Sequence, residues 1–226
     1  MAIDFSAKRQ VYNKDELLEQ NLIEQGFAQN PYGLLQQWVD DAIKIQHGEP
    51  YAFSLATCGA DNRPSVRTLL MRKIALCDDD IVCEFYSNYD SQKGQDLAQN
   101  PYAEALFFWS DLERQLRIFG RIEQLDRTQS KAYFNSRPKD SQLAAWVSCP
   151  QSGVVADRAT MEQTFAKLGD KFGDAVPLPT FWGGYRLIAE RIEFWQGRAN
   201  RMHDRICYKK SNHQSKGNWY YERLLP

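Results

Sequence analysis

The sequence predicts an antiparallel β-barrel with helices on its outside, a mainly β protein with peripheral helices (α+β). Three observations lead to this prediction. Short apolar runs of strand length recur along the chain, turn-rich connections join them in local pairs, and segments with helical periodicity lie between these pairs. The 226 residues suffice for one large domain, so we expect a single domain over 1–226 with a mobile N-terminal segment over 1–25.

The first half of the chain changes from helical to strand periodicity near residue 50. Pro31 stands at the start of an amphipathic helical pattern, where proline fits the first turn. The turn-rich segment Cys58–Pro64 then separates two apolar runs, which predicts a hairpin, and Asn100-Pro101 closes a short helix. In order, we expect helices over 14–25 and 31–46, strands over 51–57, 66–71 and 81–87, and a helix over 90–100.

The second half of the chain begins with a further hairpin, continues with helices and ends with strands. Ser110–Glu113 separates two apolar runs as a hairpin turn, Pro138 divides the helical stretch, and Gly173–Pro179 is a linker. In order, we expect strands over 102–109 and 114–125, helices over 126–136, 139–147 and 157–172, and strands over 185–195, 205–210 and 218–223.

The composition excludes several classes of function. Hydrophobic residues make up 43% of the chain and the formal net charge is -1, which argues against disorder, nucleic-acid binding and an anionic membrane partner. Five scattered cysteines form no CxxC pair, so we expect reduced thiols and no metal site. No apolar run approaches the roughly 20 residues that span a bilayer. Because no signal peptide is apparent either, we expect a soluble, cytoplasmic protein.

Common nucleotide-binding and hydrolase motifs are missing from the sequence, which contains no Gly-x-Gly-x-x-Gly, no phosphate loop and no Gly-x-Ser-x-Gly. Charge is nevertheless uneven. Residues 177–226 hold nine Lys and Arg against four Asp and Glu, an excess that fits a small anionic ligand better than a polyanion.

The segment Glu193–Arg205 is the strongest candidate for a small-molecule site. Its thirteen residues include three arginines, a histidine and a tryptophan. Guanidinium groups bind phosphate or carboxylate with a planar fork, histidine titrates near neutral pH, and tryptophan offers a flat apolar face. Taken alone, the segment also fits a charged strand and turn whose arginines are solvated.

Several other runs occur with this segment in a consistent order. They are Arg67–Arg72, Phe85–Asn88, Leu112–Gln115, Tyr133–Gln142, Gln151-Ser152 and Phe181–Tyr185. Together, from about Arg9 to Pro226, the chain resembles the pyridoxine/pyridoxamine 5'-phosphate oxidases. The resemblance implies a split β-barrel that binds FMN at the interface of a homodimer, and the strand-rich pattern is compatible with that fold.

The resemblance also implies an FMN site, which needs charged donors for the phosphate. Arg67 taken alone is better explained as an outward-facing surface arginine, and the resemblance reverses that preference. The sequence departs from the common family pattern at Gln92, where arginine is frequent, and at Arg72, where lysine is frequent. One extra residue in 148–152 makes Gln151 and Ser152 a best alignment. The implied cofactor-binding residues are Arg67, Thr68, Leu69, Leu70, Met71, Arg72, Tyr86, Ser87, Gln92, Lys93, Gln115, Gln151, Ser152, Trp195 and Arg205.

A second set of residues is implied for the substrate. Tyr133 and Arg137 are four apart and would share a helical face, and Ser141 lies near a helix start, where backbone donors favour anions. A helix cap at Ser141 and a surface ion pair at Arg137 are the structural alternatives. The implied substrate-binding residues are Arg9, Tyr12, Arg72, Tyr133, Arg137, Ser141, Arg201 and His203.

Arg201 and His203 are the implied catalytic pair, beside the pyridine ring of the substrate. On a strand, residues two apart point to one face, so both side chains would converge on one ligand. The implied reaction oxidises pyridoxamine 5'-phosphate or pyridoxine 5'-phosphate to pyridoxal 5'-phosphate, with hydride transfer to FMN and reoxidation by molecular oxygen that releases hydrogen peroxide. The pair would orient the substrate and assist loss of its proton.

Two other functions remain open from the sequence. A non-catalytic split-barrel carrier or sensor of flavin or pyridoxal phosphate would keep the phosphate-binding residues but would not need Arg201 and His203. A binder of single-stranded nucleic acid would need a basic groove, which the net charge of -1 disfavours.

Overall fold

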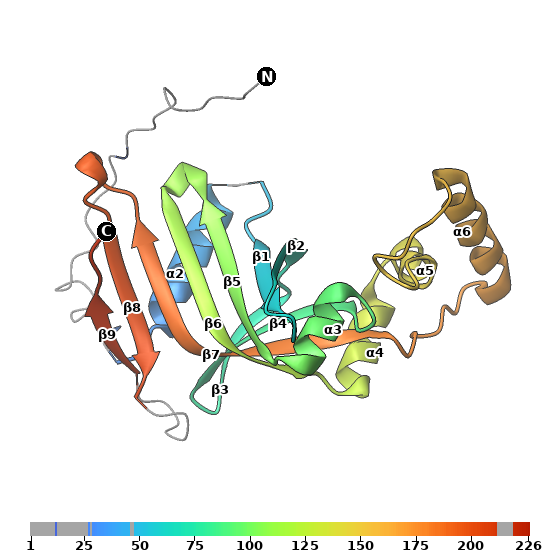
Figure 1. Cartoon of the computed structure of the whole chain (residues 1–226), viewed down its shortest axis with the longest axis horizontal. Helices are drawn as coiled ribbons and strands as arrows, with labels where there is room; N and C mark the ends of the chain where they lie inside the picture. The colour runs from blue at the N-terminus through green and yellow to red at the C-terminus, as the bar shows by residue number, and fades with distance from the viewer. Residues whose placement is uncertain (1–11, 13–26, 28, 46–47, 212–218) are drawn as a thin grey trace.

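The computed structural model describes residues 12, 27, 29–45, 48–211 and 219–226, and its framework is a nine-stranded antiparallel sheet (Figure 1). Seven strands follow one another in the order β2-β1-β5-β6-β7-β4-β3, and β8 and β9 branch from β7. The strands are β1 (Ala52–Cys58), β2 (Pro64–Leu70), β3 (Lys73–Cys77), β4 (Asp80–Asn88), β5 (Tyr102–Trp109), β6 (Arg114–Gln124), β7 (Trp182–Gln196), β8 (Asp204–Lys210) and β9 (Trp219–Arg223).

The branch in the sheet lies along β7. Its first half pairs with β4, its second half pairs with β8, and β6 lies along its other edge. The β6–β7 register shifts at Gly120, where any side chain would collide with the carbonyl oxygen of Ile188. The described strands therefore form an open, split barrel. This confirms the predicted mainly β class with peripheral helices.

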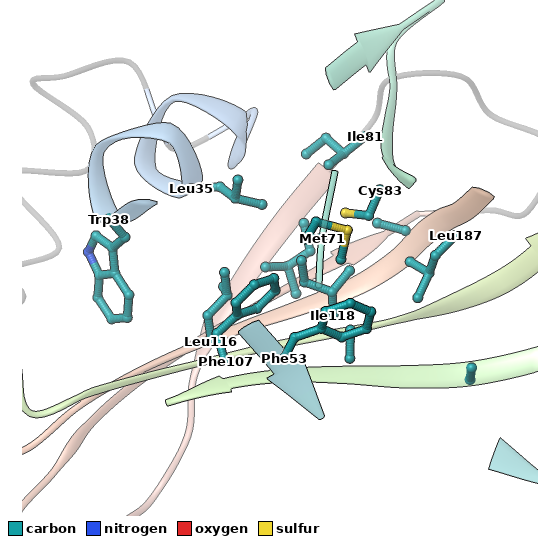
Figure 2. Packing of buried hydrophobic residues seen from close by; sticks show 14 of the residues in the cluster. Leu35, Trp38, Phe53, Met71, Ile81, Cys83, Phe107, Leu116, Ile118 and Leu187 are labelled. Carbon is teal, nitrogen blue, oxygen red and sulfur yellow. The ribbon is translucent and has the colours of Figure 1, made fainter. Parts of the chain in front are cut away.

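Five α-helices occur in the described residues, outside the strands. These helices are α2 (Tyr32–Lys44), α3 (Gln92–Gln99), α4 (Arg127–Ser136), α5 (Lys139–Val147) and α6 (Arg158–Phe172). From α2, Leu35 and Trp38 belong to the same buried cluster as Phe107 and Leu116 (Figure 2), and the Trp38 ring contacts Phe194 edge-on at 5.0 Å. Full burial of a large apolar side chain stabilises the folded state by about 1.5–3 kcal/mol.

A second apolar cluster lies at the other end of the molecule. Phe134 of α4 and Leu143 of α5 pack with Val176 and Trp182, the first residue of β7. This cluster fixes α4 and α5 against the start of β7 (Figure 1). The candidate site lies at this junction.

Most predicted elements are present within a few residues of their expected bounds. Strand β3 was not expected, and β7 begins at Trp182 rather than at residue 185. The predicted helix over 14–25 and, apart from Tyr12, the predicted mobile segment over 1–25 lie outside the described residues. None of the helices in the described ranges is long and apolar enough to cross a membrane.

Candidate active site

A cavity of about 350 Å³ lies between the end of β2, the end of β4 and the helices α4 and α5. Nine of the residues implied for cofactor or substrate line it, so one cavity gathers residues from four separate motifs. They are Thr68, Leu69, Leu70, Arg72, Tyr86, Ser87, Tyr133, Arg137 and Gln151. Met71, which directly follows β2, does not line the cavity, because its side chain lies in the core (Figure 2).

One wall of the cavity is aromatic. The rings of Tyr86 and Tyr133 stack with their centroids 3.8 Å apart and an interplanar angle of 19°. Trp182 lies nearly parallel to both, at 5.7 Å from Tyr86 and 6.3 Å from Tyr133. Gly184 permits this arrangement, since a side chain there would meet the Tyr86 ring at 2.8 Å. The wall can hold a flat ring by stacking.

Two arginines face the same cavity. The Arg72 guanidinium lies over the Tyr51 and Tyr133 rings, at 5.8 and 6.0 Å from their centroids. Arg137 follows the last residue of α4 and is not part of the helix, so the predicted helical face shared with Tyr133 is wrong although both side chains reach the cavity. Its Nη1 is buried without a hydrogen-bond partner, and burial lowers the pKa of Arg137.

Ser141 lies in the first turn of α5, as predicted, and is half-buried. It does not line the cavity. The α5 N-terminus has no side-chain cap. The alternative interpretation of Ser141 as a helix cap is therefore wrong.

Two further cations belong to this region, Lys93 at the start of α3 and Arg67 on β2. Lys93 is 7% exposed, and within the described residues its Nζ donates to two neutral oxygens, Ser91 Oγ at 3.0 Å and Gln151 Oε1 at 3.3 Å. Burial, and then the positive charge of Arg67, lowers the pKa of Lys93 to about 8. Within the described residues no carboxylate lies within ion-pair distance of Lys93. Its contact with Gln151 supports the alignment of that residue.

Arg67 is held on its strand by neutral acceptors. It donates to Thr57 Oγ1 at 2.7 Å and to Ser65 Oγ at 2.6 Å, and only its Nη2 approaches Asp96, at 3.9 Å. Burial lowers the pKa of Arg67, opposed by the charge of Asp96. A buried lysine and a half-buried arginine that share one carboxylate, 3.9 Å from the arginine, leave an excess of positive charge, which fits a phosphate.

Gln92 does not face this pair of cations. Its amide donates to Asp96 Oδ1 at 2.8 Å, while Thr57 donates to Asp96 Oδ2 at 2.6 Å. Gln92 thus holds the carboxylate that neighbours Arg67. Ser152 is exposed, with a φ of 71°, and the cavity does not include it.

The remaining implied residues form a second group at the ends of β6, β7 and β8. In the strand register Gln115 lies opposite Trp195, and Trp195 lies opposite Arg205, so the three form one row across the sheet. Arg205 donates to Glu193 at 2.8 Å and to the carbonyl of Leu225 at 2.9 Å. None of this row lines the cavity.

Tyr12, Trp195 and His203 make a small aromatic cluster in this second group. His203 lies 4.7 Å from Trp195 and 5.5 Å from Tyr12 between ring centroids. Tyr12 packs over Gly197, where an added side chain would approach its ring to 2.8 Å. Arg9, the other residue implied for this segment, lies outside the described residues.

Arg201 and His203 are not on a strand, which corrects the predicted geometry. Arg201 ends a 3-10 turn over Ala199–Arg201, has a φ of 59° and is exposed, and His203 lies in the connection to β8. His203 Nδ1 accepts a hydrogen bond from the Arg198 amide at 3.1 Å. Burial, and then the charge of Arg201, lowers the pKa of His203. A neutral His203 therefore carries its proton on Nε2 and presents a donor.

A single chain keeps the two groups apart. In Figure 1 the turn before β8 lies at one end of the molecule, and the ends of β4 and α4 lie toward the other. Strand β7 connects them, with Trp182 in the cavity wall and Trp195 in the second group. Thirteen strand steps at about 3.3 Å each correspond to roughly 40 Å of extended chain.

Sequence reasoning missed several residues that shape the site. Trp182 and Asn88 line the cavity, and Asp96 organises Arg67 and Gln92. Trp182 was part of a recognised run but was given no role. Asp96 follows Gln92 by four residues, a spacing that places both on one helical face. In the described ranges no three His, Cys, Asp or Glu side chains group as a metal site.

Comparisons with known proteins identify the family of this chain. The profile of a family described as "Pyridoxamine 5'-phosphate oxidase" matches residues 39–172, and one described as "Pyridoxine 5'-phosphate oxidase C-terminal dimerisation region" matches residues 182–226. A relative from Psychrobacter sp. (strain PRwf-1), named pyridoxine/pyridoxamine 5'-phosphate oxidase, is 52% identical, and the match covers 99% of this chain and 100% of the relative.

Two solved structures are also similar. PhzG from Burkholderia lata 383, in complex with tetrahydrophenazine-1-carboxylic acid, has a TM-score of 0.81 at 27% identity, with 94% of this chain and 98% of that chain covered. A pyridoxamine 5'-phosphate oxidase-related, FMN-binding protein from Nostoc punctiforme has a TM-score of 0.66 at 18% identity, with 86% and 96% covered, and shares the fold.

Proposed function

The chain belongs to the pyridoxamine 5'-phosphate oxidase family, and from that membership we propose that it oxidises pyridoxamine 5'-phosphate or pyridoxine 5'-phosphate to pyridoxal 5'-phosphate. We further propose FMN as its cofactor and molecular oxygen as its electron acceptor. When bound, FMN would supply the redox chemistry, namely uptake of a hydride from the 4' carbon and reoxidation by oxygen with release of hydrogen peroxide. The protein supplies binding and orientation.

The observation that carries this proposal is the excess of positive charge around one ring-lined cavity. Among the described residues Lys93 has no carboxylate partner and Arg67 has only Asp96 at 3.9 Å, so a cofactor phosphate would supply the balancing negative charge. Arg72 and Arg137 lie at the aromatic wall. A second phosphate there would accept a hydrogen bond from Arg137 Nη1, which is buried without a partner. Two separate clusters of donors suit a phosphorylated cofactor and a phosphorylated substrate.

The second group of residues would act on the other side of the substrate ring. Arg201 offers an exposed guanidinium, and His203 offers its Nε2–H because Nδ1 already accepts from Arg198. In this geometry His203 donates a hydrogen bond that orients the reacting substituent, and taking up a proton at Nδ1 would require breaking the Arg198 contact. Tyr12, packed on Gly197, would cover the ring and exclude water.

We propose that each complete site combines the cavity of one protomer with the second group of its partner in a homodimer. Roughly 40 Å of extended β7 separates the two groups in one chain, far more than a single pyridine ring can bridge. In a twofold dimer, both composite sites form at once from the same two surfaces. The match of residues 182–226 to a region described as a dimerisation region supports this assembly.

The proposed activity is tested by assaying the purified protein with each phosphorylated vitamer. We expect a yellow protein whose released chromophore is FMN, substrate-dependent formation of pyridoxal 5'-phosphate, and one hydrogen peroxide for each product molecule. Anaerobic mixing with substrate should reduce the flavin. FMN binding without flavin reduction would instead favour a non-catalytic carrier, and a bound FAD would contradict the cofactor proposal.

The composite site is tested by complementation between two inactive variants. Arg137→Ala removes a cavity residue and Arg201→Met a residue of the second group. In a twofold heterodimer of the two, one site is intact and one is doubly altered, so about half of the parent activity should return. A heterodimer of Arg72→Met with Arg137→Ala, both on the cavity side, is the matched control and should stay inactive. Absence of recovery in the first pair would contradict a shared site.

A further inference from the structure

Trp182 lies where the cavity wall meets the second apolar cluster. It is the first residue of β7, 7% exposed, and its ring contacts Phe134 edge-on at 5.2 Å with an interplanar angle of 67°. Its carbonyl accepts from Arg127 Nη1 at 2.8 Å, which fixes the backbone at this point. Trp182 therefore presents one defined ring face at the cavity.

The guanidinium of Arg137 lies over this face. Its Cζ is 4.8 Å from the Trp182 ring centroid, against 5.8 Å for Phe134. Across the described residues no carboxylate pairs with Arg137, and its Nη1 is buried without a partner. An aromatic face is thus the principal support of this cation.

The kind of support matters for what Arg137 can bind. A carboxylate would occupy the N–H groups at the edge of the guanidinium, whereas stacking on a ring uses its flat face and leaves the in-plane donors available. A phosphate entering the cavity would meet those donors already oriented, so less rotational freedom is lost on binding.

We propose that Trp182 is a positioning residue that holds Arg137 for the substrate phosphate and thereby sets the preference for phosphorylated over unphosphorylated ligands. This inference rests on the proposed function of the cavity. Tyr86 and Tyr133 belong to the same wall, but the Arg137 guanidinium lies over the Trp182 ring, so the indole ring is the part of the wall that supports this cation.

The test compares Trp182→Leu and Trp182→Phe, each alone and in an Arg137→Ala background. Trp146→Leu is the matched control, because Trp146 belongs to the same apolar cluster as Trp182 but packs on Phe181 and Phe172, whereas the described rings under the Arg137 guanidinium are those of Trp182 and Phe134. The first readout is the dissociation constant of pyridoxal 5'-phosphate, with pyridoxal as the unphosphorylated probe. The second is the separation of KM from kcat for pyridoxine 5'-phosphate.

We expect Trp182→Leu to weaken pyridoxal 5'-phosphate binding and to raise KM by roughly 3- to 30-fold, the size of a partly desolvated cation–π contact. Binding of pyridoxal, kcat and FMN content should stay close to those of the parent. Trp182→Phe should recover most of the loss because it restores a ring face. In the Arg137→Ala background, Trp182→Leu should have no further effect.

Several results would overturn the proposal. One is equal weakening of pyridoxal and pyridoxal 5'-phosphate, and another is an undiminished effect of Trp182→Leu in the Arg137→Ala background. If Trp182→Leu fails to fold, a Trp182→Phe variant as impaired as Arg137→Ala would also contradict it. Failure of the proposed function is separate, because it would show as absent oxidation by the parent while the binding comparison still tests Trp182.

Discussion

Replacing Lys93 by methionine should weaken FMN binding and remove most of its dependence on pH above neutrality. Lys93 is buried at the start of α3, and its acceptors among the described residues are the neutral oxygens of Ser91 and Gln151. Burial, and then the charge of Arg67, lowers its pKa to about 8. A phosphate beside it would supply the missing negative charge. Methionine keeps the length and the apolar stem but removes the charged donor.

The environment of Lys93 determines how much FMN affinity should be lost and in which direction the affinity should change with pH. Losing one charged donor to phosphate typically costs about 1.5–3 kcal/mol, which is roughly a 10- to 150-fold rise in the dissociation constant. Since the lysine pKa is lowered in the free protein, bound phosphate raises it again, and binding above pH 8 takes up a proton. Affinity should be highest below about pH 8 and then fall by up to roughly tenfold per pH unit. The phosphate itself is already a dianion there, because its second pKa is near 6.

The dissociation constant of FMN and its dependence on pH are measured by titrating the apoprotein with FMN and following the quenching of flavin fluorescence between about pH 7 and pH 9. Lys167→Met, an exposed lysine on α6, is the matched control and should behave like the parent. If the affinity of Lys93→Met falls with pH as steeply as that of the parent, another group titrates. If the parent shows no slope, Lys93 does not contact the phosphate.

Two further predictions concern the other cations. Arg67→Ala should weaken FMN binding by about 1.5–3 kcal/mol. Arg63→Ala is the matched control and should bind FMN like the parent, because Arg63 is an exposed arginine near Asp61 in the preceding turn. Equal retention of FMN by both variants on gel filtration would remove Arg67 from the cofactor site. Arg201→Met and His203→Asn should keep FMN, with Arg201→Met clearly impaired in kcat/KM and His203→Asn impaired less, since asparagine still offers an N–H donor. Rapid mixing under anaerobic conditions measures flavin reduction alone, and unchanged rates in both variants would contradict a catalytic role. Because the pKa of His203 is lowered, the His203→Asn defect should be largest where the parent imidazole is neutral and should shrink on acidification.

Strands β1 and β5 were predictable because burial alternates along them, and this alternation appears in the sequence. Strand β1 alternates buried and half-buried residues along its length, and its predicted bounds differ by one residue at each end. Strand β3 was missed because it is short and no residue of it is fully buried. A signal existed in its turn: Asp78 and Asp79 both have positive φ, 48° and 70°, and join β3 to β4. Aspartate pairs tolerate that backbone, which a two-residue hairpin requires.

The residues of the site were easier to predict than their geometry. Motifs identified the lining of the cavity, but they could not indicate that Gln92 turns to Asp96 or that Arg137 stacks on Trp182. Both depend on contacts between segments far apart in the chain or on side-chain choices within a helix. The strand expected for Arg201 and His203 fails for a local reason, because Asn200 and Arg201 both adopt positive φ and form a tight turn.

The division of the site between two groups could have been inferred from the sequence through strand length. The predicted strand over 185–195 already separated Phe181–Tyr185 from the Glu193–Arg205 segment, and the observed β7 extends this separation to Trp182 and Trp195. An extended strand cannot fold back on itself, so motifs at its two ends lie tens of ångströms apart. If the cavity and the second group both bind one small substrate, the two must therefore come from different copies of the chain. Strand length between motifs is therefore a direct argument for a shared site, independent of any surface that a dimer would bury.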